Sequence, residues 1–180
     1  MKLDTTIPID DEYSLTEFRE SDVAQLVKLL DTPELYATTL SIPTPYQESD
    51  ARTWVDYATR PHAHFERLTN WAIRDGSATV VGGIGFILTA GVTHRGEIGY
   101  WIGAPFWGRG IATAAVGKVC EIGFTEFDFT KITAHVYSFN PASCRVLEKN
   151  GFEHEGLLKK HFCKNGQLID SHVFGVMRDN

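Results

Sequence analysis

Residues 107–112 read WGRGIA, and this short stretch says more about the fold than any other part of the sequence. Gly108 and Gly110 stand on either side of a cation, Arg109, just before an apolar helical pattern over residues 111–127. Glycine has no Cβ to hold an anion away from backbone N–H groups. A helix N-terminus adds unpaired N–H groups and the positive end of the helix dipole. The stretch is therefore typical of a pyrophosphate-binding turn, with a plain tight turn at a helix start as the alternative.

Two other phosphate-binding patterns do not fit this stretch. It lacks the G-x-x-x-x-G-K-[ST] pattern of nucleoside-triphosphate loops and the G-x-G-x-x-G pattern of dinucleotide folds. The elements around it are mixed: hairpin turns are predicted at residues 75–77 and 165–166. Their order predicts an α/β fold in which an antiparallel meander leads into a β-α-β unit. Strands are predicted at residues 13–19, 70–74, 79–88, 97–103, 132–139 and in two tail segments, and helices at residues 22–30, 48–57, 111–127 and after Asn140.

Two segments carry a resemblance to a known family. Residues 97–102 (EIGYWI) followed by WGRGIAT, and residues 140–152 (NPASCRVLEKNGF), resemble the paired signatures of the GNAT superfamily of N-acetyltransferases. The nearest resemblance is to the Rim-type subfamily, the ribosomal-protein N-terminal acetyltransferases. The family loop pattern is Arg/Gln-x-x-Gly-x-Gly/Ala; this chain matches it at Gly110 and Ala112 and departs from it at Trp107. The resemblance is firm over residues 95–155 and looser before them.

The resemblance implies one N-acetyltransferase domain over residues 1–180. Its fold class is α/β (α+β), with a mixed six- or seven-stranded sheet, a splayed central parallel pair and helices on both faces. Splayed strands leave N–H and C=O groups that an extended polyamide arm can satisfy.

Acetyl-CoA is the implied donor, bound without a metal. The strand through Tyr100 and Ile102 is implied to pair with the pantetheine amides, and Asn140 to hydrogen-bond the same arm as well as cap its helix. Trp107 either packs on the cofactor or is buried in the core. The remaining residues of the loop and helix start are implied to wrap the pyrophosphate: Gly108, Arg109, Gly110, Ile111, Ala112 and Thr113.

Attack on a thioester requires a neutral amine, which a general base can provide. The resemblance implies this role for Glu97, acting directly or through water; a surface glutamate beside Arg95 is the alternative. Ser143 is implied as the proton donor to the leaving thiolate, because Rim-type enzymes often carry a serine there. A local hydrogen bond near the helix start is the other interpretation of Ser143. The tyrosine that many family members use falls at Leu147, which cannot donate a proton.

The acceptor is left open by the residues themselves. At pH 7 an α-amine is neutral in roughly one molecule in ten, and a lysine amine in roughly one in several thousand. A protein N-terminal α-amine, on a ribosomal or other protein, is favoured as the acceptor. Its larger neutral fraction requires less help from a base, and the Rim-type resemblance implies the same acceptor. A small-molecule amine (polyamine, amino acid, aminoglycoside) and a non-catalytic acyl-CoA-binding module are the alternatives. Direct transfer in a ternary complex is expected over a covalent intermediate on Cys144, for which no histidine partner is evident.

Composition narrows the class of protein further. Of 180 residues, 43% are hydrophobic, enough for a sizeable core, and the net charge of −6 disfavours nucleic-acid binding while suiting a cationic acceptor. The N-terminal residues 1–4 lack the apolar run of a secretory signal, so no membrane association and a cytoplasmic location are expected. Either a monomer or a homodimer is compatible with the sequence. Three widely spaced cysteines, Cys120, Cys144 and Cys163, favour reduced thiols.

Two further groups of residues remain open. His161 and His172 of the tail either line an acceptor pocket or are ordinary strand residues. The variable connection through Tyr36, Pro43 and Tyr46 is where the resemblance implies that acceptor specificity lies.

Overall fold

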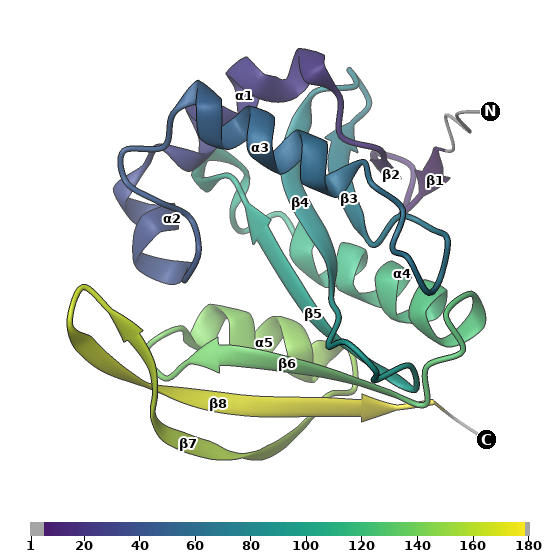
Figure 1. Ribbon diagram of the computed structural model, residues 1–180, viewed down its shortest axis with the longest axis vertical. Coiled ribbons are helices and arrows are strands. Elements are labelled where there is room, and N and C mark those ends of the chain that lie inside the picture. The colour runs from purple at the N-terminus through teal and green to yellow at the C-terminus, as the bar shows by residue number, and fades with distance from the viewer. Residues whose placement is uncertain (1–5, 179–180) are drawn as a thin grey trace. The chain divides into compact units, whose positions relative to one another are not determined.

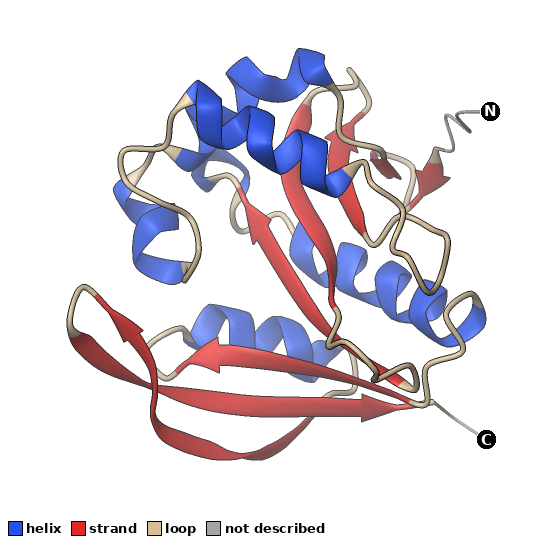
Figure 2. Cartoon of the chain, in the orientation of Figure 1, coloured by secondary structure: helices blue, strands red, loops and turns tan. Residues whose placement is uncertain are grey.

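The computed structural model describes residues 6–178, so the N-terminal residues 1–4 considered above lie outside it. Over these residues the chain forms eight strands and five α-helices (Figures 1 and 2). The helices are α1 (Val23–Leu30), α2 (Pro33–Thr38), α3 (Glu48–Ala58), α4 (Ile111–Thr125) and α5 (Pro141–Lys149). The strands are β1 (Ile7–Pro8), β2 (Tyr13–Thr16), β3 (Asn70–Asp75), β4 (Val80–Ile87), β5 (Arg95–Ile102), β6 (Lys131–Tyr137), β7 (Glu153–Lys164) and β8 (Gln167–Met177).

The strands form a mixed sheet with the order β1-β2-β3-β4-β5-β6-β8-β7, which confirms the α/β class. The sheet has eight strands where six or seven were predicted. The additional strand is β1, which pairs with Leu15 and Ser14 of β2. A strand of two residues has no alternating pattern, so its sequence alone does not distinguish it from a loop.

The chain divides into two compact units. The first contains the residues up to Gly85 together with Tyr100–Ala115, and the second contains Phe86–Gly99 together with the residues from Val116 onward. In the first unit the apolar faces of α1, α2 and α3 pack on β3 and β4, because their large side chains recur at helical spacing. The core there includes Phe18, Leu26, Leu30, Leu35, Tyr46, Val55 and Val80.

The start of α1 is held by a tertiary contact. Asp22 is the N-cap residue, but its side chain makes no cap hydrogen bond to the helix. Instead its carboxylate accepts the Arg19 backbone N–H at 2.7 Å and pairs with the buried guanidinium of Arg74, also at 2.7 Å. Arg74 donates in addition to Thr16 Oγ1 at 2.6 Å. A tertiary ion pair has thus taken the place of a local cap.

In the second unit an aromatic cluster forms the core. The rings of Phe86, Phe127 and Phe129 lie 5.2 to 5.4 Å apart, and all three side chains are buried. The predicted turns are also present here. Gly151 has the left-handed φ of 76° that ends α5, and Asn165 and Gly166 have φ of 51° and 75° in the β7–β8 hairpin, drawn in yellow in Figure 1.

The parallel pair of strands is short. β5 and β6 pair at Arg95↔Lys131, Gly96↔Ile132 and Glu97↔Thr133, whereas β5 continues to Ile102 and β6 to Tyr137. Glu97 therefore lies at the last paired position of β5. This is the position at which a splayed parallel pair begins to offer backbone groups to a ligand.

Across residues 6–178, no helix has the length and apolar character that crossing a bilayer requires.

Candidate active site

The glycine-rich loop has the geometry of an anion-binding turn. It follows the short 3-10 helix Ala104–Phe106 and leads directly into α4. Gly108 and Gly110 have φ of 76° and 80°, a region that residues with a Cβ rarely adopt. A Cβ built at either glycine would meet nothing within 4 Å, so the backbone at both positions faces open space. A ligand can therefore approach the loop backbone closely.

The helix that follows supplies donors at the same place. The Ala114 N–H donates to the Gly110 carbonyl at 3.1 Å, so the hydrogen-bonding ladder of α4 begins at Gly110. The amides of Ile111, Ala112 and Thr113 form the first turn, where no carbonyl of the helix precedes them. The positive end of the helix dipole adds to them. Residues 108–113, all within the first unit, fit a pyrophosphate group.

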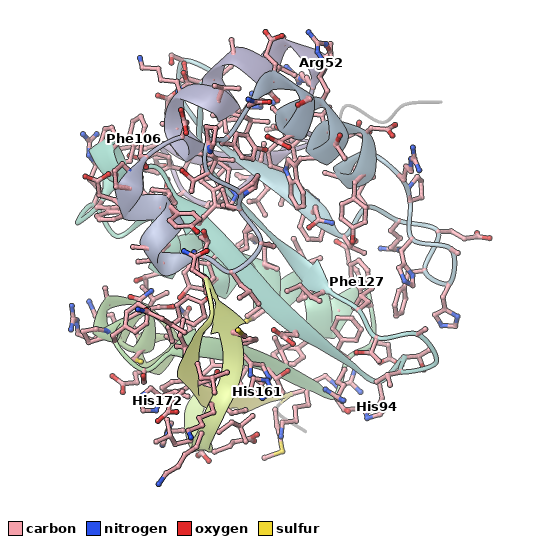
Figure 3. The ribbon with its side chains drawn as sticks, turned by 60° about the vertical axis from the view of Figure 1, so that its left-hand side comes forward. Arg52, His94, Phe106, Phe127, His161 and His172 are labelled. Carbon is pink, nitrogen blue, oxygen red and sulfur yellow. The ribbon has the colours of Figure 1, made fainter. Side chains whose placement is uncertain are left out.

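Arg109 contributes positive charge from a side chain held within the loop. Its Nη2 donates to the Pro105 carbonyl at 3.1 Å, and its guanidinium carbon lies 5.4 Å from the centre of the Phe106 ring. Phe106 is labelled in Figure 3 in the segment after β5. These contacts hold the charge near the turn, where it favours an anionic guest.

Trp107 is not a core residue. Its side chain remains 48% exposed, and its Nε1 donates to the Ile102 carbonyl at 2.6 Å. The interpretation of Trp107 as buried is therefore wrong, while stacking on a bound cofactor stays a prediction. Ile102 was expected to pair with the pantetheine amides. Because its carbonyl already accepts this hydrogen bond, only one of its two lone pairs is left for such a contact. Tyr100, on the same strand, is half-buried.

The second unit brings together Asn140 and Ser143. Asn140 is the N-cap of α5, and its Oδ1 accepts the Ser143 backbone N–H at 3.2 Å. This confirms the capping role predicted for Asn140, and Pro141 occupies the first turn of the helix, where its missing N–H is no loss. Ser143 lies half-buried on the first turn. Leu147 is fully buried one turn later, so that position belongs to the core.

Glu97 lies next to a histidine. Its Oε2 is 4.0 Å from Nε2 of His135 on β6, and the carboxylate side chain is 32% exposed. The interpretation of Glu97 as a glutamate simply facing water beside Arg95 does not describe this contact. The Nδ1 of His135 in turn lies 3.4 Å from the hydroxyl of Ser171 on β8. A carboxylate, an imidazole and a hydroxyl from three strands thus form one connected group.

Rings surround this group. The His161 ring stacks on His135 with centroids 5.2 Å apart and planes inclined by 14°. Phe162 lies 6.1 Å from His135 and 5.6 Å from Tyr137. Tyr137 Oη is buried, and no hydrogen-bond partner reaches it among residues 6–178. Burial raises the pKa of this phenol, so at neutral pH it is a proton donor without an acceptor.

Sequence reasoning missed His135, Tyr137 and Ser171, although one signal was present. Residues 131–137 (KITAHVY) alternate in the sequence, so Lys131, Thr133, His135 and Tyr137 share one face of β6, opposite the apolar Ile132, Ala134 and Val136. Of the two tail histidines, His161 contacts this group. His172 points to the other side of the hairpin, where its Nδ1 lies 2.9 Å from Nε2 of His154 (Figure 3).

The other candidate regions are less suited to catalysis. Burial first, and then Glu148, raise the pKa of the Cys144 thiol, which opposes a nucleophilic role. Tyr46 is a core residue whose pKa burial raises to about 12, so it does not line an acceptor groove. A groove of about 470 Å³ lies between the segment Glu17–Glu20 and α3, beside Arg52, and none of the predicted site residues line it.

The comparisons with known proteins agree with this geometry. The domain description "Acetyltransferase (GNAT) domain" matches residues 14–153, and the chain therefore belongs to the GNAT acetyltransferase family. Among relatives, it is 35% identical over 114 residues to the uncharacterized N-acetyltransferase YoaA of Bacillus subtilis, which covers 63% of this chain and 64% of YoaA. The chain thus spans just under two thirds of the length of that relative.

Two further likenesses bear on the acceptor. L-amino acid N-acetyltransferase AaaT of Escherichia coli is 27% identical over 152 residues, covering 81% of this chain and 86% of AaaT. The solved structure of RimL, a ribosomal L7/L12 α-N-protein acetyltransferase in complex with coenzyme A, aligns with a TM-score of 0.85 at 20% identity, covering 96% of this chain and 98% of RimL. At that identity the likeness to RimL establishes the fold.

Proposed function

We propose that residues 1–180 act as one acetyl-CoA-dependent N-acetyltransferase domain that moves an acetyl group onto a primary amine by direct transfer in a ternary complex. The observation that carries the proposal is the exposed loop with left-handed Gly108 and Gly110 at the start of α4, in a chain of the GNAT family. The first-turn amides and Arg109 supply the donors and charge for the coenzyme A pyrophosphate. The proposed path of the pantetheine arm follows Tyr100 and Ile102, both in the first unit.

The proposed acceptor is a protein N-terminal α-amine. It needs less help to lose its proton than a lysine amine does, because its pKa is about 8 rather than about 10.4. RimL, which shares the fold, is named for such an acceptor. A small amine is the second candidate, supported by the likeness to AaaT, which is named for L-amino acids. Within either reaction, Glu97 is the proposed base and Ser143 the proposed donor to the departing thiolate.

Coenzyme A binding tests the loop assignment directly. A ligand at a hundred times its Kd stabilises a protein by about 2.7 kcal/mol, which for a chain of this size raises Tm by roughly 5–10 °C. Gly110→Asp places a side chain and a negative charge where the pyrophosphate belongs, so this shift is expected to disappear. The matched control is Gly166→Asp, which has a similar φ of 75° with open space around it but lies in the β7–β8 turn. An equal coenzyme A shift in both variants would contradict the loop assignment.

Acceptor class is tested by turnover. Wild-type protein and acetyl-CoA are incubated with an array of peptides that have free N-termini and with a panel of amino acids, polyamines and aminoglycosides, and coenzyme A release is measured. Acetylation of peptide N-termini with the highest kcat/KM is expected. Preference for a small amine would replace the proposed acceptor, and coenzyme A binding without turnover on any amine would favour an acyl-CoA-binding module.

A further inference from the structure

The contact between Glu97 and His135 lies where the parallel strands stop pairing. Glu97 is the last paired residue of β5, opposite Thr133, and His135 is two residues further along β6 on the same face as Thr133. Both side chains are partly accessible, with 20% of His135 and 32% of Glu97 exposed. Two polar groups therefore meet at a position that a small cationic group can reach.

The Ser171 hydroxyl lies beside the ring nitrogen of His135 that does not face Glu97. Ser171 is fully buried, and its hydroxyl has the His172 carbonyl at 3.2 Å as an acceptor. The same oxygen lies 3.4 Å from His135 Nδ1, where either atom can donate according to the tautomer of the ring. When the hydroxyl proton goes to the carbonyl, Oγ accepts from Nδ1–H, and Nε2 of the neutral ring presents a lone pair towards Glu97.

A lone pair and a carboxylate oxygen 4.0 Å apart are two acceptors that cannot bond to each other. The arrangement becomes favourable when a donor with several N–H groups enters beside both of them. A primary ammonium is such a donor: it offers three N–H groups and a positive charge that the carboxylate stabilises. The rings of His161 and Phe162 wall the same site, and π faces favour cations.

We propose that Glu97 and His135 together form the acceptor-amine subsite, in which Glu97 holds the ammonium and Nε2 of His135 takes its proton. The inference rests on the acetyltransferase function proposed above, and it moves the role of base from Glu97 to His135 and leaves Glu97 to bind the ammonium. Ser171 acts as a positioning residue, because it sets the tautomer of His135 without touching the amine.

Protons, bonds and electron pairs are all accounted for in the proposed reaction. The ammonium gives one proton to Nε2, which leaves a neutral amine and an imidazolium next to the Glu97 carboxylate. The amine lone pair forms the C–N bond, the C–S bond of acetyl-CoA breaks, and its electron pair stays on sulfur. Ser143 gives its hydroxyl proton to the thiolate and takes up the second proton of the attacking nitrogen, giving an amide and coenzyme A thiol. His135 then releases its proton to solvent, the one proton that the overall reaction produces.

The groups that titrate near His135 are few among the described contacts. β5 contributes Glu97 and β7 contributes His161, whereas the contact from β8 is the uncharged Ser171. On the same face of β6 lie Tyr137 and Lys131, and Lys131 is paired with Glu155 at 2.6 Å. A pH effect on the amine step is therefore assigned to Glu97, His135 and His161 together, and variants must separate them.

The test compares His135→Gln with His154→Gln, which removes an imidazole that lies on β7 and contacts His172. Each variant and the wild type are assayed for kcat/KM from pH 5.5 to 10 with the best acceptor amine, and for the coenzyme A-induced rise in Tm. His135→Gln is expected to lower kcat/KM by about 10²–10⁴-fold, to change the pH profile, and to keep the coenzyme A shift. His154→Gln is expected to match the wild type.

Two results overturn the inference alone: a His135→Gln enzyme within threefold of the wild type, or an unchanged pH profile. Nitrogen-15 NMR of histidine gives an independent readout that needs no turnover, since the neutral His135 ring is expected as the Nδ1–H tautomer and Ser171→Ala is expected to shift it. An Nε2–H tautomer in the wild type also overturns the inference. A wild type that neither binds coenzyme A nor acetylates any amine overturns the proposed function together with this site.

Discussion

Acidic residues in this chain perform different tasks according to their partners. Asp22 is buried, and its charge is balanced by the equally buried Arg74 through hydrogen bonds of 2.7 and 2.9 Å. Glu97 faces a histidine instead, at 4.0 Å and with one third of its side chain exposed. A carboxylate that accepts two strong hydrogen bonds, as Asp22 does, has a structural role. A carboxylate that lies beside another hydrogen-bond acceptor, as Glu97 does, can still bind a cation or a proton. Residue type alone does not distinguish them.

The buried ion pair predicts a large stability effect. Asp22→Asn leaves the Arg74 guanidinium buried without a countercharge, and removing one partner of such a pair costs about 3–5 kcal/mol. The free energy of unfolding, measured by urea denaturation, should fall by that amount. The control is Glu155→Gln, which removes the partner of Lys131 in a pair with about one third of each side chain exposed. Its expected effect is under 1 kcal/mol, and similar losses in the two variants would contradict the argument.

The three cysteines are expected to react in a fixed order. Cys163 is exposed, Cys144 is half-buried with a pKa raised by its burial, and Cys120 is buried with a pKa raised to about 12. Thiolate is the reactive form, so a raised pKa slows alkylation at pH 8. Timed labelling with iodoacetamide and mass spectrometry should show Cys163 modified first and Cys120 last. Early modification of Cys144 would indicate an activated thiol and revive the covalent alternative.

At the scale of elements, the geometry of a helix start is determined mainly by the residues of its first turn. The start of α4 is built by two left-handed glycines, and the start of α5 by an asparagine cap followed by proline. Both were predicted, because a cap or a positive φ depends on residues within one turn. The start of α1 was not, since the carboxylate of Asp22 bonds a residue 52 positions away. A side chain that could cap its own helix pairs instead with a distant residue when that residue is buried and carries the opposite charge.

The cap of α5 separates two roles of Asn140. Asn140→Ala removes the acceptor of the Ser143 N–H and should lower the stability by about 1 kcal/mol, whereas Asn140→Asp preserves a cap of similar strength. Urea denaturation measures this difference. Calorimetry with coenzyme A measures the second role: if Asn140 also contacts the pantetheine arm, both variants should bind more weakly. Unchanged affinity in both would limit Asn140 to capping.

For the molecule as a whole, net charge is the property most open to test. A charge of −6 attracts cationic acceptors over a distance that salt shortens, from about 30 Å at 0.01 M to about 8 Å at 0.15 M. Raising the salt from 10 to 500 mM is therefore expected to increase KM for a lysine-rich acceptor peptide several-fold while kcat stays constant. A peptide with the same N-terminus and no further charge serves as the control. Equal salt dependence for the two peptides would exclude a role for the overall charge.

Much of the fold was predictable, and so was the presence of a glycine-rich loop. The α/β class, the two hairpins and the glycine-rich loop follow from patterns a few residues long, and the structure contains each of them. The helix predicted over residues 111–127 is also present and ends two residues earlier, at Thr125. The exposed position of Trp107 was not predictable, because burial depends on what packs over a side chain. Strand β1 was not predictable for the same reason, because its two residues form a strand only when they pair with β2.

By itself, the sequence determined the family, the order of elements and the glycine-rich turn at the start of α4, since all of these depend on neighbours along the chain. Only the tertiary structure brought Glu97, His135 and Ser171 together, from strands that are 38 and 36 residues apart. Which side chains face each other across a sheet depends on strand order and register, and a shift of one residue would turn each of them to the opposite face. The cofactor loop is thus a local property of the chain, and the proposed amine subsite is a property of the folded sheet.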